Sequence, residues 1–107
     1  MKMLLDENIP FRLYKDFSGE HEVYSAIYMG WNSLTNGELL KQMVSKGFEA
    51  LITWDQNIQF QQNFKQYPIT VFVFRTPTND YNDLKALIPK IHAAIKQGVS
   101  SGPIEIY

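Results

Sequence analysis

The sequence contains no cysteine, which excludes disulfide bonds and metal sites built on thiolates. It also contains no apolar run close to the roughly 18 residues that a membrane-spanning helix needs. The N-terminal apolar run is too short for a signal peptide. We therefore expect a soluble, cytoplasmic protein that has no membrane partner.

An excess of positive charge is missing as well, because the formal net charge is -1. A protein that binds a long stretch of duplex usually carries a basic excess. We therefore expect any contact with nucleic acid to be local, or a bound cation to supply the missing positive charge.

Several catalytic patterns are missing too. The sequence has neither a glycine-rich phosphate loop nor a G-x-S-x-G elbow, which disfavours P-loop nucleotide-binding proteins and serine hydrolases. The two histidines, His21 and His92, fall in different predicted elements. Because His92 lies off the apolar stripe of the last predicted helix, we expect its ring to be solvated.

What the sequence does contain is enough apolar material for one bulky core. Apolar residues make up 45% of the 107 residues, and aromatic residues make up 14%. A chain of this length fits one domain and leaves little room for a second. We expect a single domain over residues 1–107.

Short apolar runs alternate with amphipathic stretches along the chain. The apolar runs predict strands at residues 3–5, 21–27, 50–52, 69–74 and 104–106. Helical spacing predicts helices at residues 9–17, 35–47, 58–64 and 79–97, and Pro89 should kink or split the last one. The alternation predicts a three-layer αβα fold with a mainly parallel central sheet.

Three acids fall where such a sheet binds its ligands, beyond the carboxyl ends of the strands. Asp6 directly follows the first predicted strand, and Asp55 closely follows the third. Glu38 lies in the first turn of the helix that leads into the third strand, so a right-handed crossover brings it to the same edge. Crowded carboxylates favour a hard cation, and we expect Mg²⁺ or Mn²⁺ here.

Each acid also has a purely local interpretation. Asp6 would cap the helix that follows it. Glu38 would close a capping box with Thr35, because the segment T-N-G-E has the required spacing. Asp55 would form an Asx turn with Asn57. Both sets of interpretations stay open at the level of the sequence.

Polar residues surround the three acids in the sequence and are candidates for binding substrate or supporting the site. Glu7 and Asn8 follow Asp6, and Thr53 and Asn57 flank Asp55. Arg75 follows the fourth predicted strand, where it would pair with a substrate phosphate, with one of the acids, or with an ordinary salt-bridge partner.

Large aromatic residues near these segments have two interpretations. Trp31 and Trp54 would either stack on nucleic-acid bases or pack half-buried against the core. Tyr28, Trp31 and Phe60 would form a dimer surface or a partner surface if they are exposed, and core packing if they are not.

Four motifs occur in a matching order with a known family: LLDEN at 4–8, NGELL at 36–40, ITWDQN at 52–57 and QQN at 61–63. With these motifs the sequence resembles the small PIN-like proteins, a branch of the PIN-domain ribonucleases that often act as toxins of bacterial toxin–antitoxin pairs. The resemblance covers nearly the whole chain.

The resemblance implies a PIN-like fold and a metal-dependent endoribonuclease. Asp6, Glu38 and Asp55 would be the catalytic acids and the ligands of Mg²⁺ or Mn²⁺. RNA would be hydrolysed by a metal-activated water, and an antitoxin would be the natural partner. Asn36 and Asn57 stand where this group often has acids, and fewer charges should weaken binding of a second metal ion.

Two other functions fit the same pattern. The first is a PIN-like binding module that has lost catalysis, which the neutral Asn57 permits. The second is a signalling module resembling a phospho-receiver domain, with Thr76 as the hydroxyl after the fourth strand. The last predicted strand has no lysine to bind a phosphoryl group, which disfavours the second function.

Overall fold

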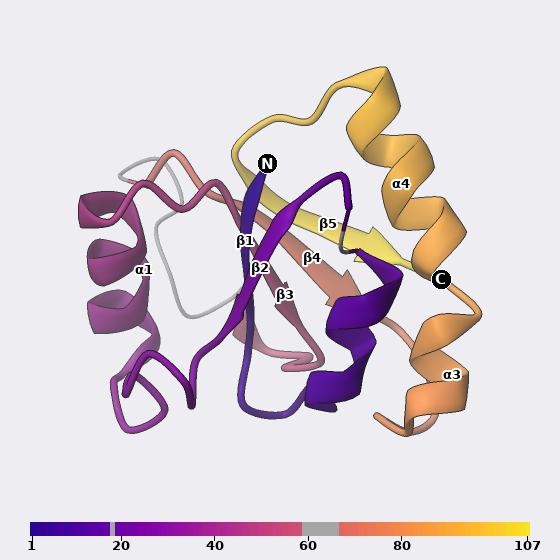
Figure 1. Cartoon of the computed structure of the whole chain (residues 1–107), viewed down its shortest axis with the longest axis horizontal. Helices are drawn as coiled ribbons and strands as arrows, with labels where there is room; N and C mark the ends of the chain where they lie inside the picture. The colour runs from indigo at the N-terminus through magenta and orange to yellow at the C-terminus, as the bar shows by residue number, and fades with distance from the viewer. Residues whose placement is uncertain (18, 59–66) are drawn as a thin grey trace.

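The computed structural model describes residues 1–17, 19–58 and 67–107. In these residues one sheet has the strand order β2-β1-β3-β4-β5, and every neighbouring pair is parallel (Figure 1). The strands are β1 (Lys2–Leu5), β2 (Glu22–Ser25), β3 (Ala50–Thr53), β4 (Thr70–Phe74) and β5 (Gly102–Ile106). The predicted α/β class is confirmed, and the sheet that was expected to be mainly parallel is parallel throughout the described strands.

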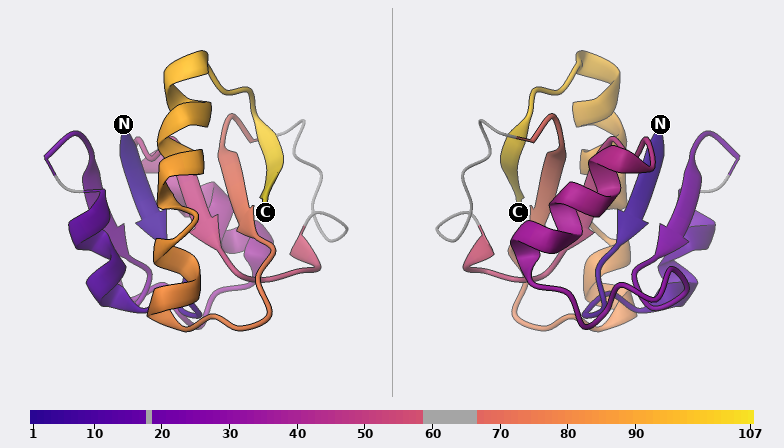
Figure 2. Two further views of the ribbon diagram at one scale, coloured as in Figure 1. Left: turned by 90° about the vertical axis from the view of Figure 1, so that its right-hand side faces the viewer. Right: turned by 90° about the vertical axis from the view of Figure 1, so that its left-hand side faces the viewer.

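Helices cover both faces of the sheet, as a parallel sheet requires because each crossover must pass over one face (Figure 2). Helix α1 (Asn36–Ser45) packs on one face. The 3-10 helix η1 (Phe11–Asp16), α3 (Tyr81–Lys85) and α4 (Ile88–Gln97) pack on the other. Within the described residues, no helix combines the length and apolarity needed to cross a membrane.

The alternation of side chains along each strand divides the core into two halves. Leu4 points toward α1, whereas its neighbours Met3 and Leu5 point toward the opposite layer. The half beneath α1 includes the buried residues Leu39, Leu40, Met43, Leu51, Val71 and Val73. The half beneath η1, α3 and α4 includes the buried residues Leu13, Phe17, Ile52, Phe72, Leu84 and Ile91. Strands buried on both faces explain why the sequence shows continuous apolar runs.

Proline determines two local features of the helices. Pro10 is the N-cap residue of η1, so the helix predicted at residues 9–17 is shorter and of the 3-10 type. The helix predicted at residues 79–97 is split into α3 and α4, with Pro89 in the first turn of α4. Proline is accepted there because the first N–H groups of a helix have no partner inside it. Most of the helix predicted at residues 58–64 lies outside the described residues.

Candidate functional site

Asp6 directly follows β1 and is the most buried of the predicted site acids, with 9% of its surface exposed. Its backbone N–H donates to the carbonyl of Ile52 on β3, at 2.9 Å. Its Oδ2 accepts a hydrogen bond from Thr53 Oγ1 at 2.7 Å, and its Oδ1 accepts from the backbone N–H of Glu7 at 2.9 Å. The side chain is therefore fixed between the ends of two neighbouring strands rather than used to cap η1.

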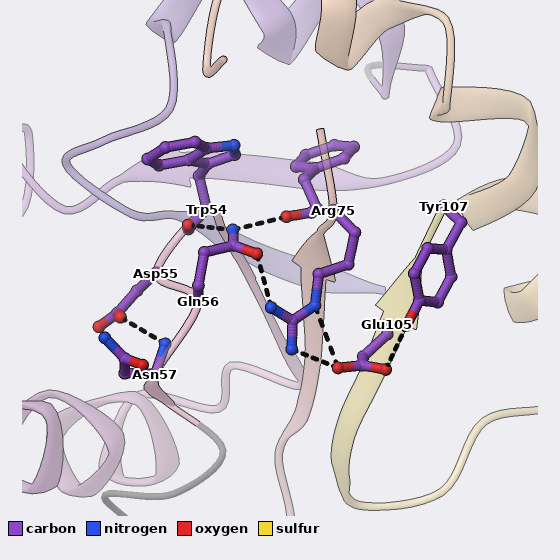
Figure 3. A network of polar contacts seen from close by, with 8 residues as sticks. Trp54, Asp55, Gln56, Asn57, Arg75, Glu105 and Tyr107 are labelled. Atoms are coloured by element: carbon purple, nitrogen blue, oxygen red, sulfur yellow. Dashed lines mark hydrogen bonds and ion pairs between the residues drawn. The ribbon is translucent and has the colours of Figure 1, made fainter. Parts of the chain in front are cut away.

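Asp55 lies two residues beyond β3, at the same edge of the sheet. Its Oδ1 accepts from the backbone N–H of Asn57 at 3.0 Å, which is the predicted Asx turn (Figure 3). Its Oδ2 accepts from Asn36 Nδ2 at 3.5 Å, which places the first residue of α1 beside it. The carboxylate thus faces the junction of β3 and α1.

One hydroxyl group joins the two aspartates. Thr53 is fully buried, and its Oγ1 donates to Asp6 while accepting from the backbone N–H of Asp55 at 3.0 Å. This hydroxyl therefore fixes the Asp6 carboxylate against the backbone of Asp55. Thr53 was expected to support the site, and its role is to connect Asp6 with the loop that carries Asp55.

Burial raises the pKa of the Asp6 carboxyl, because removal from water disfavours the charged form. The hydrogen bonds from Thr53 and Glu7 oppose this effect, and the negative charge of Asp55 adds to it. A buried acid beside a second acid is stabilised either by a proton or by a cation. Either a proton or a cation can therefore neutralise this pair.

Glu38 occupies the capping box that was its local interpretation. Its Oε1 accepts from Thr35 Oγ1 at 2.8 Å and from the Thr35 backbone N–H at 3.4 Å. In return its own backbone N–H donates to Thr35 Oγ1 at 3.2 Å. In the described residues, Asp6, Glu38 and Asp55 do not form a group with three ligand atoms close enough for one metal ion.

Asn8 and Glu7 have different roles beside Asp6. Asn8 Oδ1 accepts from the backbone N–H of Trp54 at 3.1 Å, and its carbonyl accepts from Asn79 Nδ2 at 2.7 Å. Asn8 therefore ties the loop after β1 to the loops after β3 and β4. The side chain of Glu7 is exposed and available to solvent or substrate.

Arg75 follows β4 and is held in a polar network that the sequence did not reveal (Figure 3). Its guanidinium forms an ion pair with Glu105 on β5 and donates to Gln56 Oε1 at 2.7 Å. Gln56 Nε2 in turn donates to the carbonyl of Phe74 at 2.8 Å. Of the interpretations given to Arg75, the salt bridge is the one that the structure shows, with Glu105 as its partner. Gln56 adds a hydrogen bond.

The two tryptophans are half-buried, and the contacts described for them are packing contacts and hydrogen bonds. Trp54 Nε1 donates to Thr76 Oγ1 at 3.1 Å. Thr76 is the residue whose hydroxyl was considered for a receiver domain, and this hydroxyl therefore accepts a hydrogen bond from Trp54. Trp31 packs edge-on against Phe48, with ring centroids 5.6 Å apart. Tyr28 is exposed, with 76% of its surface accessible, whereas Phe60 lies outside the described residues.

The prediction that His92 is solvated is wrong. His92 is half-buried and stacks on His21, with ring centroids 5.8 Å apart. Burial, the charge of the Met1 amino group and the neighbouring His92 together lower the pKa of His21. The helical pattern could not reveal this pair. It predicts which side of α4 carries His92, but it does not predict which other segment of the chain packs against that side.

In comparisons with known proteins, no family model, no curated protein and no solved structure matches this chain. The case for a function therefore rests on the geometry of the described residues. That geometry is a pair of aspartates joined by a buried hydroxyl at the carboxyl edge of a parallel sheet.

Proposed function

We propose that the protein is a metal-dependent endoribonuclease of the PIN-like type, with its site at the Asp6 and Asp55 pair. The observation that carries this proposal is the buried Thr53 hydroxyl, which links the carboxylate of Asp6 to the backbone N–H of Asp55 at one sheet edge. Ligands bind at this edge in open parallel sheets. Two acids fixed together there, with no cation of the chain hydrogen-bonded to either among the described contacts, suit a bound divalent ion.

The donor atoms fit Mg²⁺ or Mn²⁺. Each oxygen of Asp6 and Asp55 accepts one described hydrogen bond, so each retains a lone pair for another partner. Mg²⁺ is commonly held by one or two carboxylates, with water and substrate phosphates completing its shell. Glu38 would join only by leaving its capping box, and the neutral Asn36 and Asn57 add no charge. These features support one ion rather than two.

The residues of the chain would bind, orient and hold charge in the reaction. When bound, a divalent ion supplies positive charge that stabilises an RNA phosphate during hydrolysis. Asp6 and Asp55 would hold the ion from the ends of two neighbouring strands, and Thr53 would hold the Asp6 carboxylate against the loop that carries Asp55. The chain has a net charge of -1, so RNA contact would be confined to this edge rather than spread over the surface.

Cleavage of a labelled single-stranded RNA with added Mn²⁺ or Mg²⁺ tests the proposal. We expect activity that EDTA abolishes and that falls at least about 100-fold in Asp6→Asn and in Asp55→Asn, since changes beyond the direct ligands already cost about 10–100-fold in metal sites. Glu22→Gln, an acid-to-amide change at an exposed position of β2, is the control and should retain activity. Equal cleavage by the wild type and both aspartate variants would reject the proposal.

Glu38→Gln separates the two roles of Glu38, because glutamine also serves in a capping box but cannot neutralise a cation. If Glu38 joins the site with substrate bound, this variant keeps its stability and loses RNA cleavage. If Glu38 only caps α1, both stability and cleavage stay unchanged. The same assay therefore decides whether the site has two acids or three.

We also propose that the protein is the toxin of a toxin–antitoxin pair, with an antitoxin protein as its partner. Exposed aromatic residues such as Tyr28 would contact this partner, or would form a homodimer surface instead. Induction of the wild-type chain in bacteria should stop growth, and Asp55→Asn should not. Co-expression of the neighbouring gene product should restore growth. Normal growth under strong induction of active enzyme would reject this role without affecting the proposed nuclease.

A catalytically inactive PIN-like binding module is the second candidate, and the capping-box position of Glu38 favours it. Trp54 adjoins Asp55, so its fluorescence reports ion binding once Trp31 is replaced by phenylalanine. A Mn²⁺-dependent change in fluorescence without RNA cleavage would select this function over the nuclease.

A further inference from the structure

A second cluster of ligand-type side chains lies at the other end of the sheet. Glu20 and His21 immediately precede β2, whose first residue pairs with Lys2 at the start of β1. Asp6 follows the last residue of β1, so the length of the strand separates this cluster from the acidic edge. Figure 1 shows α4, which carries His92, running back along the sheet toward that amino-terminal end.

The geometry of the cluster fits one small ion. Glu20, His21 and His92 each offer one ligand atom, and these three atoms lie within 4.8 Å of one another. The two imidazole rings are nearly parallel, at an angle of 15°. His21 Nε2 lies 3.9 Å from Glu20 Oε2. Together the three side chains line a hollow of about 570 Å³ with Asp16 and Lys96 among its other walls.

The hydrogen bond of His92 prepares that ring to bind a metal ion. His92 Nε2 lies 3.0 Å from the carbonyl oxygen of Asp16, which can only accept, so Nε2 carries the proton. The lone pair of the neutral ring is therefore on Nδ1. Metal-binding histidines usually donate their other N–H to a carbonyl or a carboxylate in this way.

The second observation is an unpaired nitrogen on His21. Its side chain is only 7% exposed, yet its Nδ1 has no hydrogen-bond partner among the described residues. A buried polar atom without a partner is costly, by about 1–3 kcal/mol, and native structures rarely keep one without a reason. A metal ion bound at Nδ1 of this imidazole would supply the missing partner.

We propose that Glu20, His21 and His92 form a binding site for a transition-metal ion of the Zn²⁺ type, separate from the acidic edge. Two imidazoles and one carboxylate match the donors that Zn²⁺ and its neighbours prefer, whereas Mg²⁺ prefers oxygen alone. Three protein ligands leave a fourth position of a tetrahedron for water or another ligand. The ion would join the segment between η1 and β2 to α4.

Co²⁺ is the probe for this site, because its visible ligand-field bands report tetrahedral coordination. Tag-free protein is titrated with Co²⁺ and then with Zn²⁺ as a competitor. We expect one tetrahedral site in the wild type, displaced by Zn²⁺, with affinity at least about 10-fold weaker in His92→Gln and in Glu20→Gln. The double variant Asp6→Asn/Asp55→Asn should keep the tetrahedral bands of the wild type.

Glu20→Gln keeps the test decisive if a histidine variant fails to fold, because the Glu20 side chain is 80% exposed. Glu22→Gln is the matched control two residues away and should leave the affinity unchanged. Equal Co²⁺ affinity in the wild type, Glu20→Gln and His92→Gln would overturn the proposal. Loss of the tetrahedral bands in the double aspartate variant would also overturn it, because it would locate the ion at the acidic edge.

Discussion

Thr53 connects the site more directly than any acid does, because one hydroxyl serves both aspartates. Thr53→Val keeps the shape and removes the hydroxyl, which leaves buried polar groups of Asp6 and Asp55 without this partner. We expect a loss of about 1–3 kcal/mol in the free energy of unfolding, measured with urea. Thr53→Ser retains the hydroxyl and should lose clearly less. A loss in Thr53→Ser as large as that in Thr53→Val would show that the methyl group contributes as much as the hydrogen bonds.

The raised pKa of Asp6 has a defined effect on stability. The ordinary value is 3.8, and the folded protein holds the proton to a higher pH than the unfolded chain does. Above 3.8 the unfolded chain therefore binds fewer protons, so stability falls as the pH rises through the raised pKa. Urea unfolding of metal-free protein across this range should show that decline relative to Asp6→Asn. A rise in wild-type stability relative to Asp6→Asn would contradict the assigned shift.

Helix α1 begins at a complete capping box, which fixes the element that approaches Asp55. Thr35→Ala removes the side chain that accepts from the Glu38 backbone N–H. We expect a loss of about 1 kcal/mol in the free energy of unfolding, within the usual range for an N-cap. Thr35→Ser should restore most of it, because serine caps at least as well. Thermal or urea unfolding of the two variants measures the difference.

Elements with a strong local pattern were predictable from sequence. The buried runs at β1, β3 and β4, the capping box of α1 and the break near Pro89 each depend on a few neighbouring residues. The strand ends also placed Asp6 and Asp55 at one edge. The choice of Glu38 between capping and metal binding was not predictable, because both uses need the same residue at the same position.

Partners across long sequence distances were beyond the reach of local patterns. The ion pair of Arg75 with Glu105 depends on β5 lying beside β4, and the stacking of His21 on His92 depends on how α4 crosses the sheet. Alternation along β5 predicts that the Glu105 side chain points away from the core, but it does not predict which residue lies beside it. Such contacts follow from the packing of whole elements, so they became visible only in three dimensions.

At the scale of the molecule, the sheet separates two core halves that should respond independently. Ile69 belongs to the half under α1, and Ile91 belongs to the half under α4, and both are fully buried. We expect Ile69→Val and Ile91→Val each to cost about 0.5–1.5 kcal/mol. The double variant should cost their sum within about 0.5 kcal/mol, measured by urea unfolding. A larger deviation would show that strain passes through the sheet.

The strand order β2-β1-β3-β4-β5 has one further consequence. From β1 the chain first adds β2 on one side of the sheet, and it then adds β3, β4 and β5 on the other side. The connections that leave β1 and enter β3 therefore run in opposite directions. A topological switch point is a property of the chain path rather than of particular side chains. In the proposed function, the acids determine only which ligand binds at this edge. The scaffold should therefore accept new polar residues at positions 6 and 55 and present a different ligand with the same fold.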